Sequence, residues 1–281
     1  MAKELPLKIY GVLGYPVKHS LSPLMQNAAL RALNLNAKYV LFEKTEAELE
    51  GFFNSFEQEN ICGLNVTVPY KEKVIPFLSR LSEEAELIGA VNTIRVSGKK
   101  LEGFNTDGEG FIKHLVADLR FDPRGKRVAM LGAGGASKAI SVYLSIAKIR
   151  SLSIYDIDKI KLDNLIGQLK KHFKNIEFNS CNSLEELKIK ESHLLINATP
   201  VGMKESDPCL LSADMLHPDL LVYDLIYNPR RTKLLEIAHQ RGAGIANGLG
   251  MLLHQGAASF RIWTALEPPL AAMRQALEKG V

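Results

Sequence analysis

The sequence predicts a two-domain α/β protein. Along the whole chain, short β-branched or apolar runs alternate with segments whose apolar residues recur at helical spacing, which favours strands joined by crossover helices. A glycine-rich turn, Gly132-Ala133-Gly134-Gly135-Ala136-Ser137, lies between a strand and a helix near the middle of the chain and begins a second alternating series. With 281 residues, the chain is long enough for two domains that each bury a core.

The first series begins with alternating strands and helices. Strands are predicted at residues 7–13, 38–42 and 65–68, and helices at 24–33 and 46–57. This order implies parallel pairing with right-handed crossovers. Ser22 fits an N-cap of the first helix because Pro23 is favoured in the first helical position. Ser20 and Ser22 also stand near a helix N-terminus, where the helix dipole favours a ligand carboxylate.

The third strand places a charged group at a sheet edge. Val66-Thr67-Val68 is a strand-forming run, and Pro69 cannot donate to a ladder, so pairing stops there. Lys71 follows at the carboxyl edge of the strand, where open α/β sheets bind ligands, and begins a helix expected to reach about residue 81. A lone lysine in this position is usually solvated, so its neighbours decide its role.

Polar residues at two later strand ends supply those neighbours. A helix near 82–89 leads to strands at 91–96 and 101–104, which flank Ser97-Gly98-Lys99-Lys100 as a hairpin. Asn92-Thr93 and Asn105-Thr106-Asp107-Gly108 carry the polar residues, and Asp107 is the acid among them. Asp107 opens a helix expected to run to about residue 119, for which it also fits an N-cap.

The second series begins after the polar turn at 121–126, the clearest domain boundary by composition. A strand at 127–131 leads into the glycine turn and a helix to about 147, which is the strand-to-helix context of a dinucleotide site. Gly132 allows the tight turn, Gly134 lets the backbone approach a pyrophosphate, and the small Ser137 replaces the third glycine. These features predict a doubly wound Rossmann domain.

An acid follows the next strand, at 151–155. Asp156 comes about 20 residues after the glycine turn, the interval expected for a carboxylate that binds the adenosine ribose. Such a carboxylate accepts from the 2′-hydroxyl and repels a 2′-phosphate, so NAD is the preferred cofactor. NADP stays possible because Lys159 and Lys161 partly offset the repulsion, although such lysines usually form a solvated helix face.

The remaining elements complete the second series and return to the first. Segments follow at 176–178, 184–187, 193–197 and 221–225. Thr199 lies in the turn after the third of them, where ordinary turn chemistry also explains it. A long helix from about 246 to 266 has Leu252, Gln255 and Ser259 on one face, and a last helix at 270–277 closes the first domain.

Composition excludes several classes of protein. Apolar residues make up 46% and charged residues 23%, which argues against disorder. The net charge of +4 comes without a dense basic run, so no nucleic-acid partner is expected. No apolar run approaches a membrane span of ~20 residues, and the N-terminus does not resemble a signal peptide. Three cysteines without a close pair suggest a cytoplasmic protein, and the scattered histidines suggest no metal.

Five ordered motifs between about residues 10 and 265 resemble those of the shikimate dehydrogenases, a group that includes the quinate/shikimate dehydrogenases. The motifs are His19-Ser20-Leu21-Ser22-Pro23, Asn65 to Lys71, Gly89-Ala90-Val91-Asn92-Thr93, Asn105-Thr106-Asp107-Gly108 and Gly248-Leu249-Gly250-Met251. The resemblance implies a substrate domain at 1–107 plus 249–281 and a dinucleotide domain at 108–248. One departure is Asp156-Ile157-Asp158, which stands where the commonest family pattern has an Asn-Arg-Thr type segment for the 2′-phosphate.

The resemblance also implies roles for individual residues. Lys71 and Asp107 form the catalytic acid–base pair. The residues expected at the substrate are Ser20, Ser22, Asn65, Thr67, Lys71, Asn92, Asp107, Tyr227 and Gln255. Those expected at the cofactor are Gly132, Ala133, Gly134, Gly135, Ala136, Ser137, Asp156, Asp158, Thr199, Leu225 and Gly248.

The implied reaction is the reversible reduction of 3-dehydroshikimate to shikimate in aromatic amino acid biosynthesis, by a monomer or homodimer. Hydride goes to carbon and a proton to oxygen, so an acid is needed near the reacting oxygen. Two alternatives remain open. One is an NAD-dependent enzyme that acts mainly on quinate, and the other is a non-catalytic sensor of shikimate-pathway metabolites.

Overall fold

The computed structural model describes residues 6–280 and divides into two compact units. Unit 1 contains the described residues up to Gly110 together with Leu252–Gly280, and unit 2 contains Phe111–Met251. The chain leaves unit 1 within helix α4 (Asp107–Lys113) and returns to it within helix α8 (Leu249–Thr264). Each unit is built on its own six-stranded sheet, so the predicted α/β fold class is confirmed.

The sheet of unit 1 is mixed. Its strands are β1 (Lys8–Gly14), β2 (Ala37–Glu43), β3 (Ile61–Val66), β4 (Arg80–Leu81), β5 (Thr93–Ser97) and β6 (Lys100–Phe104), in the order β2-β1-β3-β5-β6-β4. The first three strands pair in parallel, as the strand–helix alternation predicted. β5 pairs antiparallel with both β3 and β6, and Gly98 takes a positive φ of 59° in the predicted hairpin.

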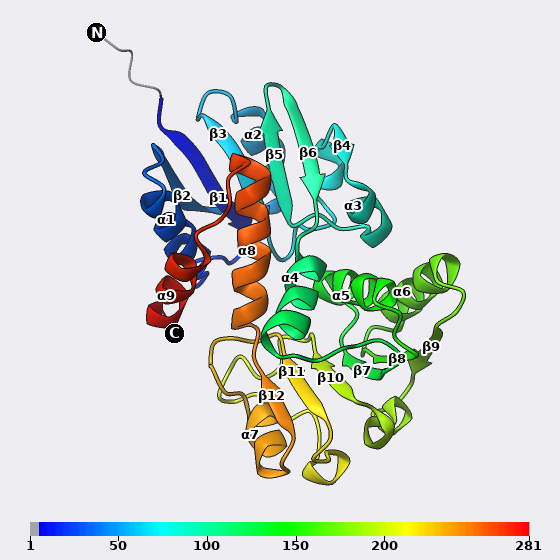
Figure 1. Ribbon diagram of the computed structural model, residues 1–281. Coiled ribbons are helices and arrows are strands. Elements are labelled where there is room, and N and C mark those ends of the chain that lie inside the picture. The colour runs from blue at the N-terminus through cyan, green and yellow to red at the C-terminus, as the bar shows by residue number, and fades with distance from the viewer. Residues whose placement is uncertain (1–5, 281) are drawn as a thin grey trace. The chain divides into compact units, whose positions relative to one another are not determined.

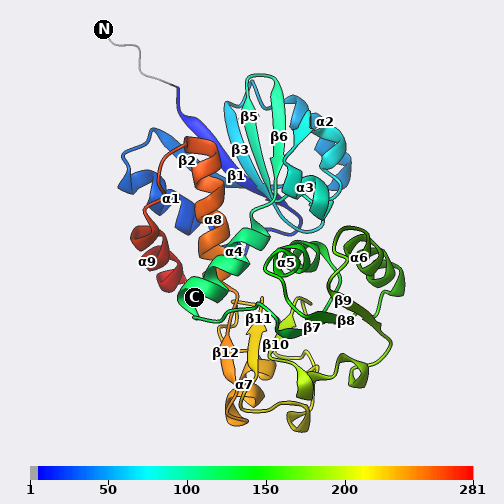
Figure 2. The same ribbon diagram turned by 45° about the vertical axis from the view of Figure 1, so that its right-hand side comes forward.

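Helices cover both faces of this sheet. They are α1 (Ser22–Ala32), α2 (Leu49–Asn54), α3 (Glu83–Ile88), α9 (Leu270–Gly280) and the part of α8 that belongs to unit 1. Figures 1 and 2 show α8, α1 and α9 on one face and α2 and α3 on the other. Side chains alternate along β3, so Leu64 and Val66 join the α2 core whereas Asn65 contacts α8. The α8 face of β3 thereby receives the polar residue.

The sheet of unit 2 is entirely parallel. Its strands are β7 (Arg127–Leu131), β8 (Ser151–Tyr155), β9 (Glu177–Cys181), β10 (Leu194–Asn197), β11 (Leu221–Asp224) and β12 (Gly244–Ala246), in the order β12-β11-β10-β7-β8-β9. Read from β9, this is the 3-2-1-4-5-6 order of doubly wound dinucleotide folds. The helices of unit 2 include α5 (Gly135–Ile146) and α6 (Lys159–His172) on one face and α7 (Lys233–Gln240) on the other (Figure 1). The chain order reverses between β7 and β10, where such sheets bind ligands.

Some local expectations are wrong. Residues 71–81 do not form an α-helix: they contain turns, a 3₁₀ segment (Ile75–Phe77) and β4. Pro76 has no N–H for an α-helical hydrogen bond and its ring would clash with the carbonyl four residues earlier, so an α-helix cannot run through it without a break. Ser22 is not the N-cap of α1, since Leu21 already has helical angles and takes that position. The helix that opens at Asp107 changes to a π-helical turn at His114–Asp118.

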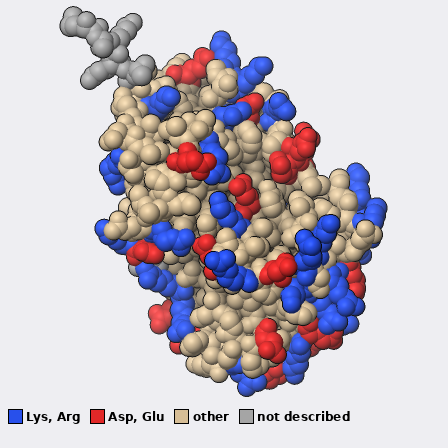
Figure 3. Space-filling view, viewed as in Figure 1, with Lys and Arg blue, Asp and Glu red and all other residues tan. Residues whose placement is uncertain are grey.

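The surface agrees with the modest net charge. On the face drawn in Figure 3, acidic and basic side chains are interspersed with uncharged surface. Among residues 6–280, no helix combines the length and the apolar character that crossing a membrane requires.

Candidate active site

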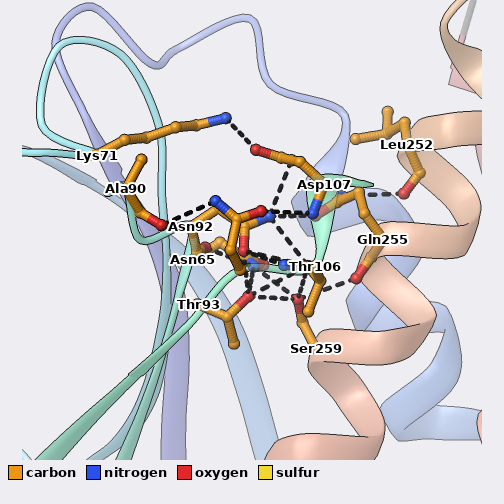
Figure 4. Close-up of polar contacts among 11 residues, drawn as sticks. Asn65, Lys71, Ala90, Asn92, Thr93, Thr106, Asp107, Leu252, Gln255 and Ser259 are labelled. Atoms are coloured by element: carbon orange, nitrogen blue, oxygen red, sulfur yellow. Dashed lines mark hydrogen bonds and ion pairs between the residues drawn. The ribbon is translucent and has the colours of Figure 1, made fainter. Parts of the chain in front are cut away.

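Lys71 and Asp107 form an ion pair in unit 1. Lys71 lies in the turns that follow β3, where its carbonyl accepts from Val91 N at 2.7 Å, and Asp107 is the first residue of α4. Lys71 Nζ donates to Asp107 Oδ2 at 2.5 Å (Figure 4). The side chains are only 15% and 8% exposed, so the structure brings a sheltered cation and anion together.

Asn92 fixes the orientation of the Asp107 carboxylate. Asn92 Nδ2 donates to Asp107 Oδ1 at 2.9 Å, while Asn92 Oδ1 accepts from the Thr106 backbone at 2.8 Å. Each carboxylate oxygen therefore accepts from one side chain, Oδ2 from the lysine and Oδ1 from the amide. Gln255, on α8, approaches the same amide at 3.4 Å. Four of the residues expected at the substrate thus lie together.

Asn65 belongs to this cluster but has all its amide hydrogens committed. Its Nδ2 lies within 3.2 Å of the Asn92 carbonyl and of the Thr93 and Ser259 hydroxyls, which are three acceptors for two hydrogens. Its Oδ1 accepts from the Tyr39 hydroxyl at 2.8 Å. Burial raises the pKa of Tyr39 well above its ordinary value, so this phenol stays a donor. Asn65 therefore holds neighbouring groups in place.

Thr67 and the two serines lie at other strand and helix ends of unit 1. Thr67 follows β3, and its backbone N donates to Leu13 O at 2.9 Å. Ser22 is buried in the first turn of α1, and its backbone N donates to Ser20 Oγ at 3.3 Å. A helix N-terminus with two hydroxyls is suited to an anion.

The glycine turn in unit 2 has the geometry of a dinucleotide loop. Gly132 has a positive φ of 100° and its N–H donates to Tyr155 O at 2.8 Å, so only glycine fits without strain. A Cβ on Gly134 would meet no atom within 4 Å, which leaves room for a ligand to approach the backbone. Gly135 and Ala136 begin α5, and Ser137 is fully buried, as close helix packing requires.

Asp156 lies against this turn. Its Oδ2 accepts from the Ala133 N–H at 2.6 Å and its Oδ1 accepts from the Asp158 N–H at 2.7 Å. Asp158 caps α6 and pairs with Lys161 Nζ at 3.0 Å. Lys159 Nζ donates to the Cys181 carbonyl at 2.8 Å. Both lysines that would offset the negative charge of Asp156 therefore have other partners.

A buried network holds the turns after β10 and β11. Thr199 Oγ1 donates its hydrogen to Asn197 Oδ1 at 2.7 Å, and Asn197 Nδ2 donates to Asp224 Oδ1 at 3.0 Å. Burial raises the pKa of Asp224, which also accepts from Thr232 Oγ1 at 2.6 Å. The hydrogen of Thr199 Oγ1 is therefore committed, and the oxygen also accepts from the Val201 N–H at 3.2 Å.

Leu225 and Gly248 meet at the end of β11. A Cβ on Gly248 would lie 1.9 Å from the Leu225 carbonyl oxygen, so this contact needs a glycine. Tyr227, two residues after Leu225, is half-buried. Thr199 follows β10, Leu225 and Tyr227 follow β11, and Gly248 follows β12. These three strands are neighbours in the parallel sheet, so all four residues lie at the carboxyl edge where such sheets bind ligands.

Several residues of these hydrogen-bond networks were not predicted from the sequence. Tyr39, Asn197, Asp224 and Ser259 were not expected at either site, and Thr93 and Thr106 were named only among the polar residues at two strand ends, without a role. Ser259 appeared only as part of a helix face, and a buried hydroxyl gives no signal in hydrophobic periodicity. Among residues 6–280, no group of histidine, cysteine and acidic side chains is arranged to hold a metal ion.

Comparison with known families gives two matches. The model described as "Shikimate dehydrogenase substrate binding domain" matches residues 12–94. The model described as "Shikimate 5'-dehydrogenase C-terminal domain" matches residues 248–278. The first range contains Lys71 and Asn92, and the second contains Gln255.

Individual relatives cover almost the whole chain. Shikimate dehydrogenase (NADP(+)) of Methanopyrus kandleri is 44% identical over 273 residues, which are 96% of this chain and 94% of that protein. The crystal structure of shikimate dehydrogenase from Aquifex aeolicus has a TM-score of 0.89 at 38% identity, covering 96% of this chain and 97% of that one. Shikimate 5-dehydrogenase from Listeria monocytogenes, in complex with shikimate and NAD, has a TM-score of 0.89 at 35% identity and 99% coverage of both chains.

Proposed function

The chain belongs to the shikimate dehydrogenase family, and from this premise we propose that it catalyses the reversible, nicotinamide-dependent reduction of 3-dehydroshikimate to shikimate. The observation that carries the proposal is the sheltered Lys71–Asp107 pair, with Asn92 on the second carboxylate oxygen. An oxidoreductase that reduces a ketone needs this type of proton donor beside the reacting oxygen.

The chemistry divides between hydride and proton. A bound reduced nicotinamide would supply the hydride for the carbonyl carbon. The Lys71 ammonium supplies the proton to the oxygen, on which negative charge develops. In the reverse direction the neutral amine takes the proton back. Asp107 orients Lys71 through the 2.5 Å bond, and its own orientation is fixed by Asn92. The residues that transfer the proton therefore all belong to unit 1.

Other residues of unit 1 would bind the rest of the substrate. Ser20 and Ser22, at the N-terminus of α1, hold its carboxylate. Asn92, Thr67 and Gln255 hold the ring hydroxyls. Asn65 acts by holding Asn92 and Tyr39, since its hydrogens are already used.

Unit 2 would bind the cofactor. Its glycine turn, residues 132–137, receives the pyrophosphate at the N-terminus of α5, and Asp156 receives the adenosine ribose. Thr199, Leu225 and Gly248 lie on the nicotinamide side. In this proposal residues 1–107 with 249–281 act as the substrate domain and residues 108–248 as the dinucleotide domain.

The preferred cofactor is NAD, with NADP as a weaker alternative. A 2′-phosphate next to Asp156 meets a carboxylate, while Lys159 and Lys161 are engaged with Cys181 and Asp158. The relative from Methanopyrus kandleri is named for NADP(+), whereas the Listeria monocytogenes enzyme was solved with NAD. The geometry around Asp156 is the reason for choosing NAD.

The deciding experiment follows nicotinamide absorbance with shikimate or quinate and with NAD or NADP, in all four combinations. The proposal expects the highest kcat/KM with shikimate and NAD. A higher value with quinate would make the protein a quinate dehydrogenase, and a higher value with NADP would overturn the role of Asp156. Absence of turnover in every combination would favour the alternative of a non-catalytic metabolite sensor. The intact Lys71–Asp107 pair argues against that alternative.

The cellular setting is proposed on simpler grounds. Cys62, Cys181 and Cys209 are all free thiols, which supports a reducing cytoplasm. Both ligands are small molecules.

A further inference from the structure

Ser259 lies one helical turn after Gln255 on the same face of α8. It is fully buried, and Figure 4 shows it beneath the Asn92 cluster, with its hydroxyl among side chains from the sheet. The hydroxyl lies 2.8 Å from Thr93 Oγ1 and 3.2 Å from Thr106 Oγ1, and it accepts from Asn65 Nδ2 at 2.9 Å. One serine thus meets three separate segments of unit 1.

The Ser259 hydroxyl has hydrogen-bond partners on its own helix and on the sheet. A hydroxyl has one hydrogen and two acceptor positions. Its hydrogen goes to the Gln255 carbonyl at 3.0 Å. One acceptor position receives Asn65 Nδ2. Thr93 Oγ1 lies 2.8 Å from the Ser259 oxygen, and its single hydrogen is shared between that oxygen and Asn92 Oδ1 at 3.0 Å. The serine therefore joins the backbone at Gln255 to two strands, β3 and β5.

The same face of α8 has a second attachment one turn further on. Trp263 Nε1 donates to the Ile94 carbonyl at 2.9 Å, and the indole packs so closely on Gly63 that a Cβ there would lie 2.4 Å from the ring. Trp263 also stacks on Tyr10, with ring centroids 5.2 Å apart. Gln255, Ser259 and Trp263 follow one another at helical spacing, so two anchors set the axial position of the residue at the active site.

In that position the side-chain amide of Gln255 can donate a hydrogen bond to a ligand. Its Nε2 donates one hydrogen to Leu252 O at 3.0 Å, and no partner for the other hydrogen exists among the described residues. Its side chain is 8% exposed and reaches the Asn92 amide at 3.4 Å. A small axial or rotational shift of α8 would move this amide away from a ring hydroxyl bound near Asn92.

We propose that Ser259 is a positioning residue for substrate binding, which acts by holding Gln255 at its place beside Asn92. The proposal rests on the function proposed above, because Gln255 matters only if unit 1 binds the substrate. Ser259 itself does not touch the substrate. Its hydroxyl fixes α8 to β3 and β5 under the site, and the amide of Gln255 then makes the contact.

The first test is Ser259→Ala, assayed with shikimate and NAD. We expect KM for shikimate to rise about 3–10-fold, the factor that one net hydrogen bond is worth, with kcat within about twofold. NAD binding, followed by fluorescence, should be unchanged. Ser145→Ala is the matched control, because Ser145 is a buried helix serine whose hydroxyl donates to the carbonyl four residues earlier at 2.7 Å. This control should leave KM unchanged.

The second test separates positioning from simple stabilisation. In a Gln255→Ala background, Ser259→Ala should raise KM by less than about twofold, because the residue through which it acts is gone. The same factor in both backgrounds would overturn the proposal. So would an unchanged KM in Ser259→Ala, whatever its thermal stability.

Two variants at Thr93 test the proposal if Ser259→Ala does not fold. Thr93→Val removes the partner hydroxyl from the strand side, which also donates to Asn92 Oδ1 at 3.0 Å, and should raise KM more in the parent protein than in the Gln255→Ala background, whereas Thr93→Ser, which keeps the hydroxyl, should not raise it. Equal KM values for these two variants would also overturn the proposal. The unmodified protein separates the two hypotheses: if it does not turn over shikimate, the proposed function fails, and if it does while Ser259→Ala keeps its KM, only this inference fails.

Discussion

Replacing Lys71 by alanine removes the proposed proton donor but leaves its partner anchored. Asp107 loses the 2.5 Å bond on Oδ2 and keeps the Asn92 amide on Oδ1 at 2.9 Å. We therefore expect the site to keep its shape and kcat to fall by ~10²–10⁴, the usual range for losing a general acid–base group. This corresponds to about 3–5 kcal/mol in the activation free energy.

The stability cost of Lys71→Ala should be smaller than its kinetic cost. One hydrogen bond between charged groups is lost, which is worth about 1.5–3 kcal/mol. Urea unfolding measures this quantity, and nicotinamide absorbance measures kcat with shikimate. NAD binding should stay near normal, because the glycine turn belongs to unit 2.

Lys73→Ala is the matched control for this experiment. Lys73 stands two residues away and forms an ion pair with Glu46 at an exposed position. Exposed pairs contribute little, so both kcat and stability should be close to those of the parent protein. A kcat for Lys71→Ala within tenfold of the parent value would show that Lys71 does not transfer the proton.

Three other perturbations test unit 2. Asp156→Ala should relax the discrimination against NADP, seen as a lower ratio of kcat/KM between NAD and NADP, and an unchanged ratio would contradict the repulsion argument. Burial raises the pKa of Asp224 in the folded state above its ordinary value of 3.8. At pH values between these two pKa values the native state binds more protons than the unfolded state, so the free energy of unfolding falls as the pH rises. Asp224→Asn should remove this contribution from urea unfolding measured across the window, and parallel pH profiles of variant and parent would refute it. Gly248→Ala forces a Cβ against the Leu225 carbonyl and should destabilise the protein by ~1–3 kcal/mol. Gly167→Ala, which has open space on α6, should stabilise it by about 0.5–1 kcal/mol. Equal unfolding midpoints for the two variants would refute the steric argument.

The sequence predicted those features that depend on local chemistry. Gly132 needs a positive φ, so the glycine turn was visible as a pattern. The strand expected at 65–68 lies earlier, at Ile61–Val66, although backbone hydrogen bonds to β1 and the turn after it continue as far as Val68, just before Pro69. The alternation of strands and helices gave the parallel pairing of β1, β2 and β3. The resemblance to the family is confirmed by the comparisons, while the roles of the individual residues stay predictions.

Features that depend on tertiary pairing were not visible. β4 has only two residues, Arg80 and Leu81, which form a strand because they pair with β6 and not because of any periodicity. The helix expected at 71–81 is absent for a local reason. The prediction followed the apolar spacing and neglected Pro76, which cannot donate a backbone hydrogen bond inside an α-helix. Ser259 meets Asn65 across 194 residues of sequence, a separation at which no spacing rule applies.

The hydrogen-bond saturation of Asn65 bears on attempts to redesign this protein for new ring compounds. Any replacement at that position must first give up the bonds to Tyr39 and Ser259, so most members of a randomised library there would be lost to misfolding before selection begins. Gln255 keeps an uncommitted amide hydrogen among the described residues and is the better position for diversity. Engineering of substrate choice should therefore start on the helix and leave the strand asparagine alone.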